Sequence, residues 1–278
     1  MAEVKKSFPV FSTLIVVLTA SYFLIPLYAT FQFSLQMIRG EWSLAAYRSV
    51  FSSDIFFATV SFSAVASLAA IVVGVLIVVP TAYWVRLKLP KWRPVVEFVS
   101  LMPLIIPPVV LVFGYIRLFG SSSFLPLTLS NAGTNLLLVA GYVVLSLPYM
   151  YRSVDNGMAA IDIKTLTEAA ESLGASRLRT IGTVIFPNVR SAIVSGAFLT
   201  FSISFGEFVI ASLLNRPAFG PYLVQIGQDR AYEPAALAIM SFALIWVCMV
   251  LMQLFATRKP GGRLFPRRGF KPARTATP

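Results

Sequence analysis

Long apolar stretches alternate with short polar segments along most of the chain. A transmembrane helix needs about 20 predominantly apolar residues, and six stretches approach or exceed that length. We place the spans at Phe8–Phe33, Ile55–Val85, Val95–Phe119, Asn135–Tyr151, Arg190–Leu214 and Ala235–Thr257. The pattern therefore predicts an all-α polytopic membrane protein with six transmembrane helices.

Several of these spans need comment. The fourth contains Gly141 and Pro148, which membrane helices tolerate when neighbouring helices satisfy the freed backbone groups. The third contains a proline cluster at 103, 107 and 108, which removes helix donors, so we expect a kink there. We interpret the first span as a retained helix because its apolar core is too long for a signal peptide and no small-residue cleavage site follows.

Charge predicts the orientation of these spans. The chain holds 23 lysine and arginine residues against 11 acidic ones. If the N-terminus is cytoplasmic, all but five basic residues fall on the cytoplasmic side, and those five are Arg39, Arg48, Arg117, Arg216 and Arg230. This arrangement satisfies the positive-inside rule, and the opposite orientation violates it. We therefore predict that both termini are cytoplasmic.

The same pattern divides the chain into three parts. Residues 1–54 hold the first span and an external loop, and residues 55–257 hold a core of five spans. Residues 258–278 form a basic cytoplasmic tail, for which we expect disorder. Attraction to anionic lipid explains the tail better than nucleic-acid binding, because no aromatic stacking platform accompanies its charge. Within the core, residues 152–190 form a cytoplasmic loop between the fourth and fifth spans, longer than a helix hairpin needs.

This loop has a helical pattern with recognisable ends. Thr165 and Glu168 have the spacing of a capping box, and Gly174 is placed to end the helix in the left-handed conformation. The apolar residues that recur at helical spacing on one predicted face are Leu166, Ala169, Ala170 and Leu173. A second helix is expected to begin at Ser176 and end near Pro187, which gives two short helices with a sharp corner.

The residues of the loop resemble a known family. Residues 168–175 read Glu-Ala-Ala-Glu-Ser-Leu-Gly-Ala, and residues 184–187 read Val-Ile-Phe-Pro. Their order and spacing resemble the EAA loop of type I ATP-binding-cassette (ABC) importer permeases, in which the last four positions are Ile-x-Leu-Pro. Val184 and Phe186 depart from that pattern but remain apolar. Residues 103–108 and 147–150 are also similar to that family.

The resemblance implies that the loop is a coupling helix that docks on a separate ATPase. The residues to which it assigns this role are Glu168, Ala169, Ala170, Gly174, Ala175 and Pro187. It also implies a dimer of ABC ATPase subunits at the cytoplasmic face, a second permease subunit and an external solute-binding protein, in the inner membrane of a bacterium. Periodicity alone leaves open an amphipathic helix that packs on the protein's own cytoplasmic ends.

The residue inventory argues against an enzyme. The chain has no G-x-x-x-x-G-K-[ST] motif, so any ATP is hydrolysed by another chain. It has no histidine and a single cysteine, Cys248, which argues against imidazole catalysis and clustered metal ligands, and we expect neither a cofactor nor a metal. A stand-alone secondary transporter is the alternative of another class, and internal repeats with paired membrane charges would favour it.

Glu207 is the clearest ionisable residue within a predicted span. Gly196, Thr200, Ser204 and Glu207 share one helical face, and burying a charge there is costly. This face either lines a water-filled path that attracts a cation or forms a seam between helices. The candidate pathway residues are therefore Thr200, Ser204 and Glu207.

The overall resemblance, to the second permease subunit of spermidine/putrescine-type importers, implies a polyamine as the first choice of solute. Glu207 suits such a cation. Permeases of similar sequence that handle ferric iron, thiamine, aminoethylphosphonate or sulfate give the alternatives.

Overall fold

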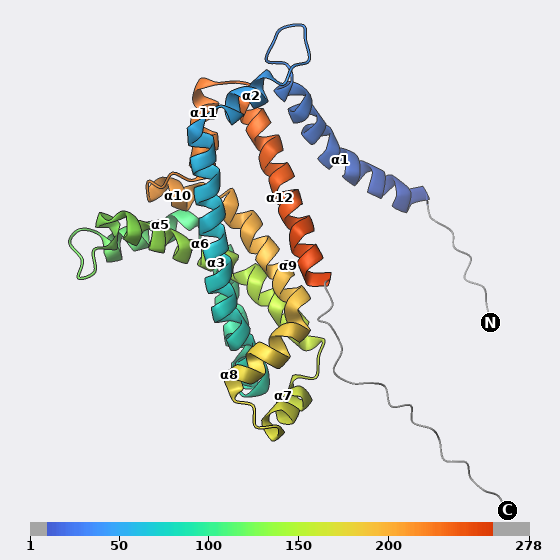
Figure 1. The fold of residues 1–278 in the computed structure, drawn as a ribbon, viewed down its shortest axis with the longest axis vertical. Helices are drawn as coiled ribbons and strands as arrows, with labels where there is room; N and C mark the ends of the chain where they lie inside the picture. Colours follow the sequence, from blue (N-terminus) through green and yellow to red (C-terminus); the bar gives the residue numbers. More distant parts are fainter. Residues whose placement is uncertain (1–9, 258–278) are drawn as a thin grey trace, which may run out of the picture.

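The computed structural model describes residues 10–257, and this part of the chain is helical without strands (Figure 1). Its α-helices are α1 (Val10–Ser34), α2 (Ala45–Phe51), α3 (Asp54–Leu87), α4 (Arg93–Leu101), α5 (Pro108–Phe119), α6 (Asn131–Ala159), α7 (Ile163–Ser172), α8 (Arg177–Thr180), α9 (Phe186–Phe205), α10 (Val209–Leu213), α11 (Phe219–Asp229) and α12 (Glu233–Thr257). The predicted basic tail, residues 258–278, lies outside the described residues.

Five described helices are long and apolar enough to cross a membrane, and α4 with α5 makes a sixth span if the bent pair is counted as one. The two halves of that pair meet at 96°. The predicted kink is therefore a full break. Pro107 is extended, with ψ at 140°, which is the conformation favoured before a proline such as Pro108.

Helices α3, α6 and α9 form the packed centre of the molecule. Small residues allow α6 and α9 to approach closely: a Cβ added to Gly196 would lie 2.7 Å from the sulfur of Met150. Helix α1 is different, because no residue of its apolar, membrane-spanning window is buried. Its contacts are mainly with α12, from which it diverges away from the centre (Figure 1). The bundle thus has a closely packed three-helix core and a first helix with few contacts to it.

Two spans are longer than the sequence indicated. Helix α6 absorbs both Gly141 and Pro148 and continues to Ala159, eight residues beyond the predicted end. On the other side of the loop, a helix without a break runs from Arg177 to Phe205. Much of the predicted loop is therefore a continuation of these two long helices, and the connection between them, which holds α7, is shorter than predicted.

The expected helix end near Pro187 is wrong. The segment Ile181–Ile185 is a π-helix that joins α8 directly to α9, with Pro187 in the first turn of α9. A proline lacks the N–H for the normal helical bond and its ring clashes with the carbonyl four residues earlier. The wider π turn accommodates both effects, which lets the helix continue.

The predicted fifth span to Leu214 is also corrected. Helix α9 ends at Phe205, and the short helix α10 begins only at Val209. Glu207 consequently lies in a break between two helices and not in the outer half of a continuous span.

Candidate functional site

The segment α7 begins with a different cap from the predicted one. The Asp162 side chain accepts hydrogen bonds from the Thr165 backbone N–H at 3.2 Å and from the Thr165 hydroxyl at 2.7 Å. The hydroxyl bond is the main reason that the pKa of Asp162 lies below its ordinary value. Glu168 instead lies 3.9 Å from the Lys164 ammonium. The capping box of Thr165 and Glu168 is therefore wrong, and Asp162 supplies the cap.

The predicted end of α7 is confirmed. Gly174 has φ at +79°, in the left-handed region that favours glycine. Its N–H donates to the carbonyl of Glu171 at 2.9 Å, and the N–H of Ala175 donates to the carbonyl of Ala170 at 3.0 Å. These two bonds form a Schellman motif, which turns the chain sharply between α7 and α8.

The inner face of α7 ties it to the membrane helices. Ile163, Thr167 and Ala170 are buried on this face. The hydroxyls of Thr167 and Tyr83 lie 3.1 Å apart in a buried hydrogen bond, and Tyr83 belongs to α3. The predicted apolar face is therefore only partly right: Ala170 is buried, but Ala169 and Leu173 are exposed.

The outer face of the α7–α8 corner is solvent-accessible and partly apolar. Leu173 is 88% exposed and Leu178 is 81% exposed, although both are large aliphatic residues. Glu168 and Ala169 are also exposed on α7. The corner lies at one end of the molecule, beyond the ends of α3 and α6 (Figure 1). Such exposed leucines are typical of a surface that another protein covers.

A charge network next to this corner escaped sequence reasoning. The guanidinium of Arg86 on α3 makes two bonds to the Asp155 carboxylate on α6, at 2.5 Å and 2.7 Å. Arg93 donates to Asp155 at 3.2 Å and to Glu97 at 2.8 Å. Asp155 falls in the predicted loop 152–190, and local sequence does not place it opposite Arg86. The network holds α3, α4 and α6 together.

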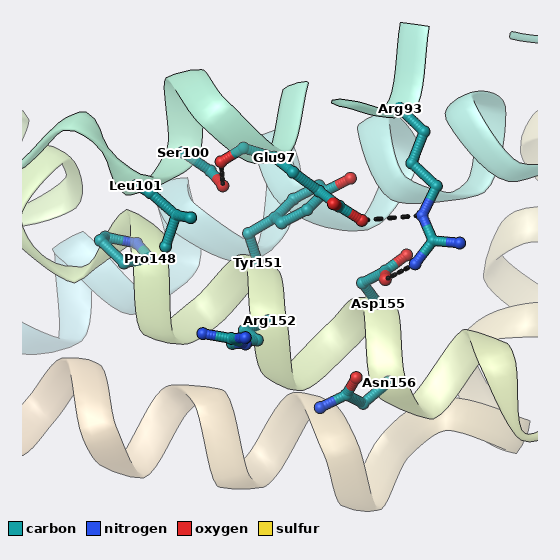
Figure 2. A pocket seen from close by; sticks show the side chains of 9 residues that line it. All are labelled: Arg93, Glu97, Ser100, Leu101, Pro148, Tyr151, Arg152, Asp155 and Asn156. Carbon is teal, nitrogen blue, oxygen red and sulfur yellow. Dashed lines mark hydrogen bonds and ion pairs between the residues drawn. The ribbon is translucent and has the colours of Figure 1, made fainter. Parts of the chain in front are cut away.

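A cavity of about 260 Å³ lies between α4 and α6 beside this network (Figure 2). The side chain of Arg152, on α6, points away from the interactions that join Arg93 to Glu97 and Asp155 (Figure 2). A second cavity, of about 350 Å³, shares Arg152 and Asn156 with the first and reaches Leu199 on α9. Arg152 therefore stands between two hollows on the exposed face of α6.

Glu207 has a local role in the structure. It is 9% exposed, and its carboxylate accepts the backbone N–H of Ile210 at 2.9 and 3.0 Å and that of Ala211 at 3.2 Å. It thereby caps the first turn of α10. The neighbouring positions Thr200 and Ser204 are fully buried within the bundle. Burial of this kind suits a helix–helix seam, and the pathway role of the three residues stays a prediction.

Comparison with known proteins identifies the family. Residues 79–259 match the family described as the binding-protein-dependent transport system inner membrane component. The chain belongs to this family. The permease is 30% identical over 199 residues to a probable molybdenum ABC transporter permease of Haloferax volcanii, covering 68% of this chain and 72% of that protein.

Two further comparisons show the breadth of the family. The permease is 26% identical to the spermidine/putrescine permease PotB of Haemophilus influenzae, over 56% of this chain and 57% of that one. A chain of a bacterial ABC transporter involved in import of the acidic polysaccharide alginate has the same fold, with a TM-score of 0.70 at 13% identity over 89% of this chain and 95% of that chain. The sequence-based recognition as an ABC importer permease of the inner membrane is confirmed.

Proposed function

We propose that this permease couples ATP hydrolysis in separate ATPase subunits to solute import through the α7–α8 corner. The observation that carries the proposal is the two-sided construction of α7. Its outer side presents exposed apolar residues such as Leu173, and its inner side is joined to α3 by the Tyr83–Thr167 hydrogen bond. A push on the corner is therefore transmitted to a membrane helix through a buried contact.

The proposed assembly needs three kinds of partner. An ATPase dimer would cover the corner from the cytoplasm, and an external binding protein would deliver the solute. A second permease subunit would complete the pathway, because one chain of this size supplies only half of a path. The alginate transporter that shares this fold has been crystallised with a periplasmic protein bound to an alginate pentasaccharide, which supports the general scheme.

A substitution at the corner tests the coupling. Gly174→Asp places a side chain at φ +79°, where an L residue is strained, and adds a charge to the docking surface. We expect the protein to insert into the membrane while uptake is lost and co-purification of the ATPase falls. Gly40→Asp is the matched control, because Gly40 also has a left-handed backbone, at φ +84°, but lies in the loop between α1 and α2. Unchanged uptake and co-purification for Gly174→Asp would refute the coupling role.

The family membership does not by itself identify the transported solute. The resemblance favours a polyamine, and one relative is a spermidine/putrescine permease, whereas another is named for molybdenum. From the sequence alone, the negative charge of Glu207 favoured a cationic solute. In the structure, however, its carboxylate accepts hydrogen bonds from backbone N–H groups of α10. A thermal-shift screen on the cognate external binding protein, with polyamines and oxyanions as ligands, would decide between these solutes. Stabilisation by spermidine supports the polyamine choice, and stabilisation by an oxyanion alone contradicts it.

A further inference from the structure

The exposed side of α6 has an unusual composition in the half of the helix nearest to α7. Between Leu137 and Met158, the exposed positions of α6 are Tyr149, Arg152 and Asn156. These residues follow each other at i+3 and i+4, so they form one strip along the helix. All three carry polar groups, and we call them the Arg152 strip.

A lipid-facing helix of the same molecule looks quite different. The exposed middle of α3 includes Val65, Leu68, Val72 and Leu76, each more than half exposed and entirely apolar. Hydrocarbon strongly disfavours charged and polar side chains, which are expected to face the bundle interior or a water-filled cavity. The contrast with α3 therefore indicates that the Arg152 strip faces water or protein in the assembled transporter and not lipid.

The surroundings of Arg152 leave it positively charged without compensation. Among the described residues 10–257, no carboxylate forms an ion pair with Arg152. The two nearby acids, Asp155 and Glu97, are engaged by Arg86 and Arg93. The network thus neutralises the acids of this region and leaves Arg152 as the unmatched charge.

A second feature of the cavity between α4 and α6, which Arg152 also lines, points to a ligand. The side chain of Tyr151 lines the cavity beside Arg152, and the residue is 4% exposed. Its buried hydroxyl has no hydrogen-bond partner among the described residues. Buried polar groups are nearly always bonded, to water or ligand where protein groups are missing. A donor is therefore available in the cavity that Arg152 also lines.

We propose that the Arg152 strip lines the inner half of the translocation pathway and that Arg152 makes this half selective for an anionic solute, of the class of small tetrahedral oxyanions. The inference rests on the proposed function, because that function places α7 at the cytoplasmic end of the permease. The Arg152 strip lies in the half of α6 nearest to α7 and is therefore in the inner half. An arginine fork suits oxyanions because it presents several N–H donors in one plane. The amide of Asn156 and the hydroxyl of Tyr149 add uncharged donors along the same strip.

Thiol labelling of the assembled transporter tests the water-lined and charged character of the strip. The transporter with its ATPase and partner permease is placed in inside-out vesicles, in a Cys248→Ala background, and Asn156→Cys is introduced. Two membrane-impermeant methanethiosulfonates are compared, one carrying a sulfonate and one a trimethylammonium group, with rates normalised to free cysteine. Leu76→Cys on the apolar side of α3 is the control that should not react.

The expected result is that Asn156→Cys reacts and favours the anionic reagent. A unit charge one helical turn away, at about 6 Å, changes each rate about threefold in water, so adding Arg152→Gln should lower the anion-to-cation ratio about tenfold. Arg117→Gln, which removes an exposed arginine on α5, should leave the ratio unchanged. The proposal is overturned if Asn156→Cys reacts no faster than Leu76→Cys, which would indicate burial against the partner permease or lipid, or if Arg152→Gln leaves the ratio unaltered.

A transport measurement completes the test. With the cognate binding protein present, Arg152→Gln should reduce uptake of labelled molybdate or sulfate, whichever the wild-type transporter accepts. Wild-type uptake of spermidine with no uptake of either oxyanion would overturn the proposal. Failure of the proposed function is seen separately, as unchanged ATPase association and uptake in Gly174→Asp, because thiol labelling of the strip does not require coupling.

Discussion

Glu207 and Arg152 are two charged residues of this permease that have opposite surroundings. Glu207 lies in the break after α9, is nearly buried, and accepts three backbone hydrogen bonds. Arg152 is exposed on α6 and forms no ion pair with a described carboxylate. The sequence pointed to Glu207 as the pathway residue and treated Arg152 as an ordinary cytoplasmic charge.

The difference shows how a charge in a membrane helix can be assigned. A buried charge must find partners, so a carboxylate such as Glu207 that accepts backbone N–H groups of the next helix has a structural explanation. An exposed charge within a membrane bundle has no such explanation, and its natural partner is water, another chain or a solute. Satisfaction of hydrogen bonds therefore separates structural charges from candidate functional ones more reliably than position along a span.

The largest effect is expected from breaking the ion-pair network beside Arg152. Asp155→Asn leaves Arg86 without its carboxylate, and removing one partner of a largely buried pair costs about 3 kcal/mol. The measurement is the thermal unfolding of the purified permease complex, in which the midpoint should fall clearly.

Glu97→Gln is the matched control for this substitution. Its pair with Arg93 is nearly half exposed, and exposed pairs contribute well below 1 kcal/mol. Equal stability of the Asp155→Asn and wild-type proteins would show that the network does not hold α3 to α6.

A smaller loss is expected when Glu207 is removed. Glu207→Ala leaves the N–H groups of Ile210 and Ala211 without their acceptor, and loss of a helix cap costs about 1 kcal/mol. Glu207→Gln retains one acceptor oxygen and should lose less stability, which makes it the informative control. The unfolding free energy and solute uptake should be measured together for both variants.

Uptake by these variants separates the two roles of Glu207. A structural cap predicts that Glu207→Gln transports like the wild type once the protein is assembled. If instead Glu207→Gln is stable but loses uptake of a cationic solute, the carboxylate acts in the pathway and the contrast with Arg152 fails.

Local features of the fold were accessible from the sequence. The apolar spans follow from hydropathy, and the turn at Gly174 follows from the preference of glycine for the left-handed conformation. The ends of the two long helices that flank α7 were not accessible. Asp155 and its neighbours have the polar composition of a loop, and the pairing of Asp155 with Arg86 is a contact in space that local composition does not reveal.

The sequence also does not reveal which face of a helix packs against which neighbour. The small and polar residues of α9, Gly196, Thr200 and Ser204, have a composition that suits either a path or a seam. The structure places Gly196 against Met150 of α6, a contact between residues far apart in the sequence. Likewise Pro187 ends a helix by local rules, but the π turn before it allows the helix to continue.

The smallest effect on stability is expected at Arg152 itself. This substitution tests directly whether Arg152, unlike Glu207, has no structural role. Arg152→Gln removes a charge that forms no ion pair with a described residue, so the unfolding free energy should change by no more than about 0.5 kcal/mol. Arg86→Gln is the matched control, because the same substitution there removes a charge bound twice to Asp155 and should be clearly destabilising. Chemical unfolding of both variants measures the difference. If Arg152→Gln destabilises the complex as much as Arg86→Gln does, Arg152 is held by a partner within the assembly and acts as a structural charge like Glu207.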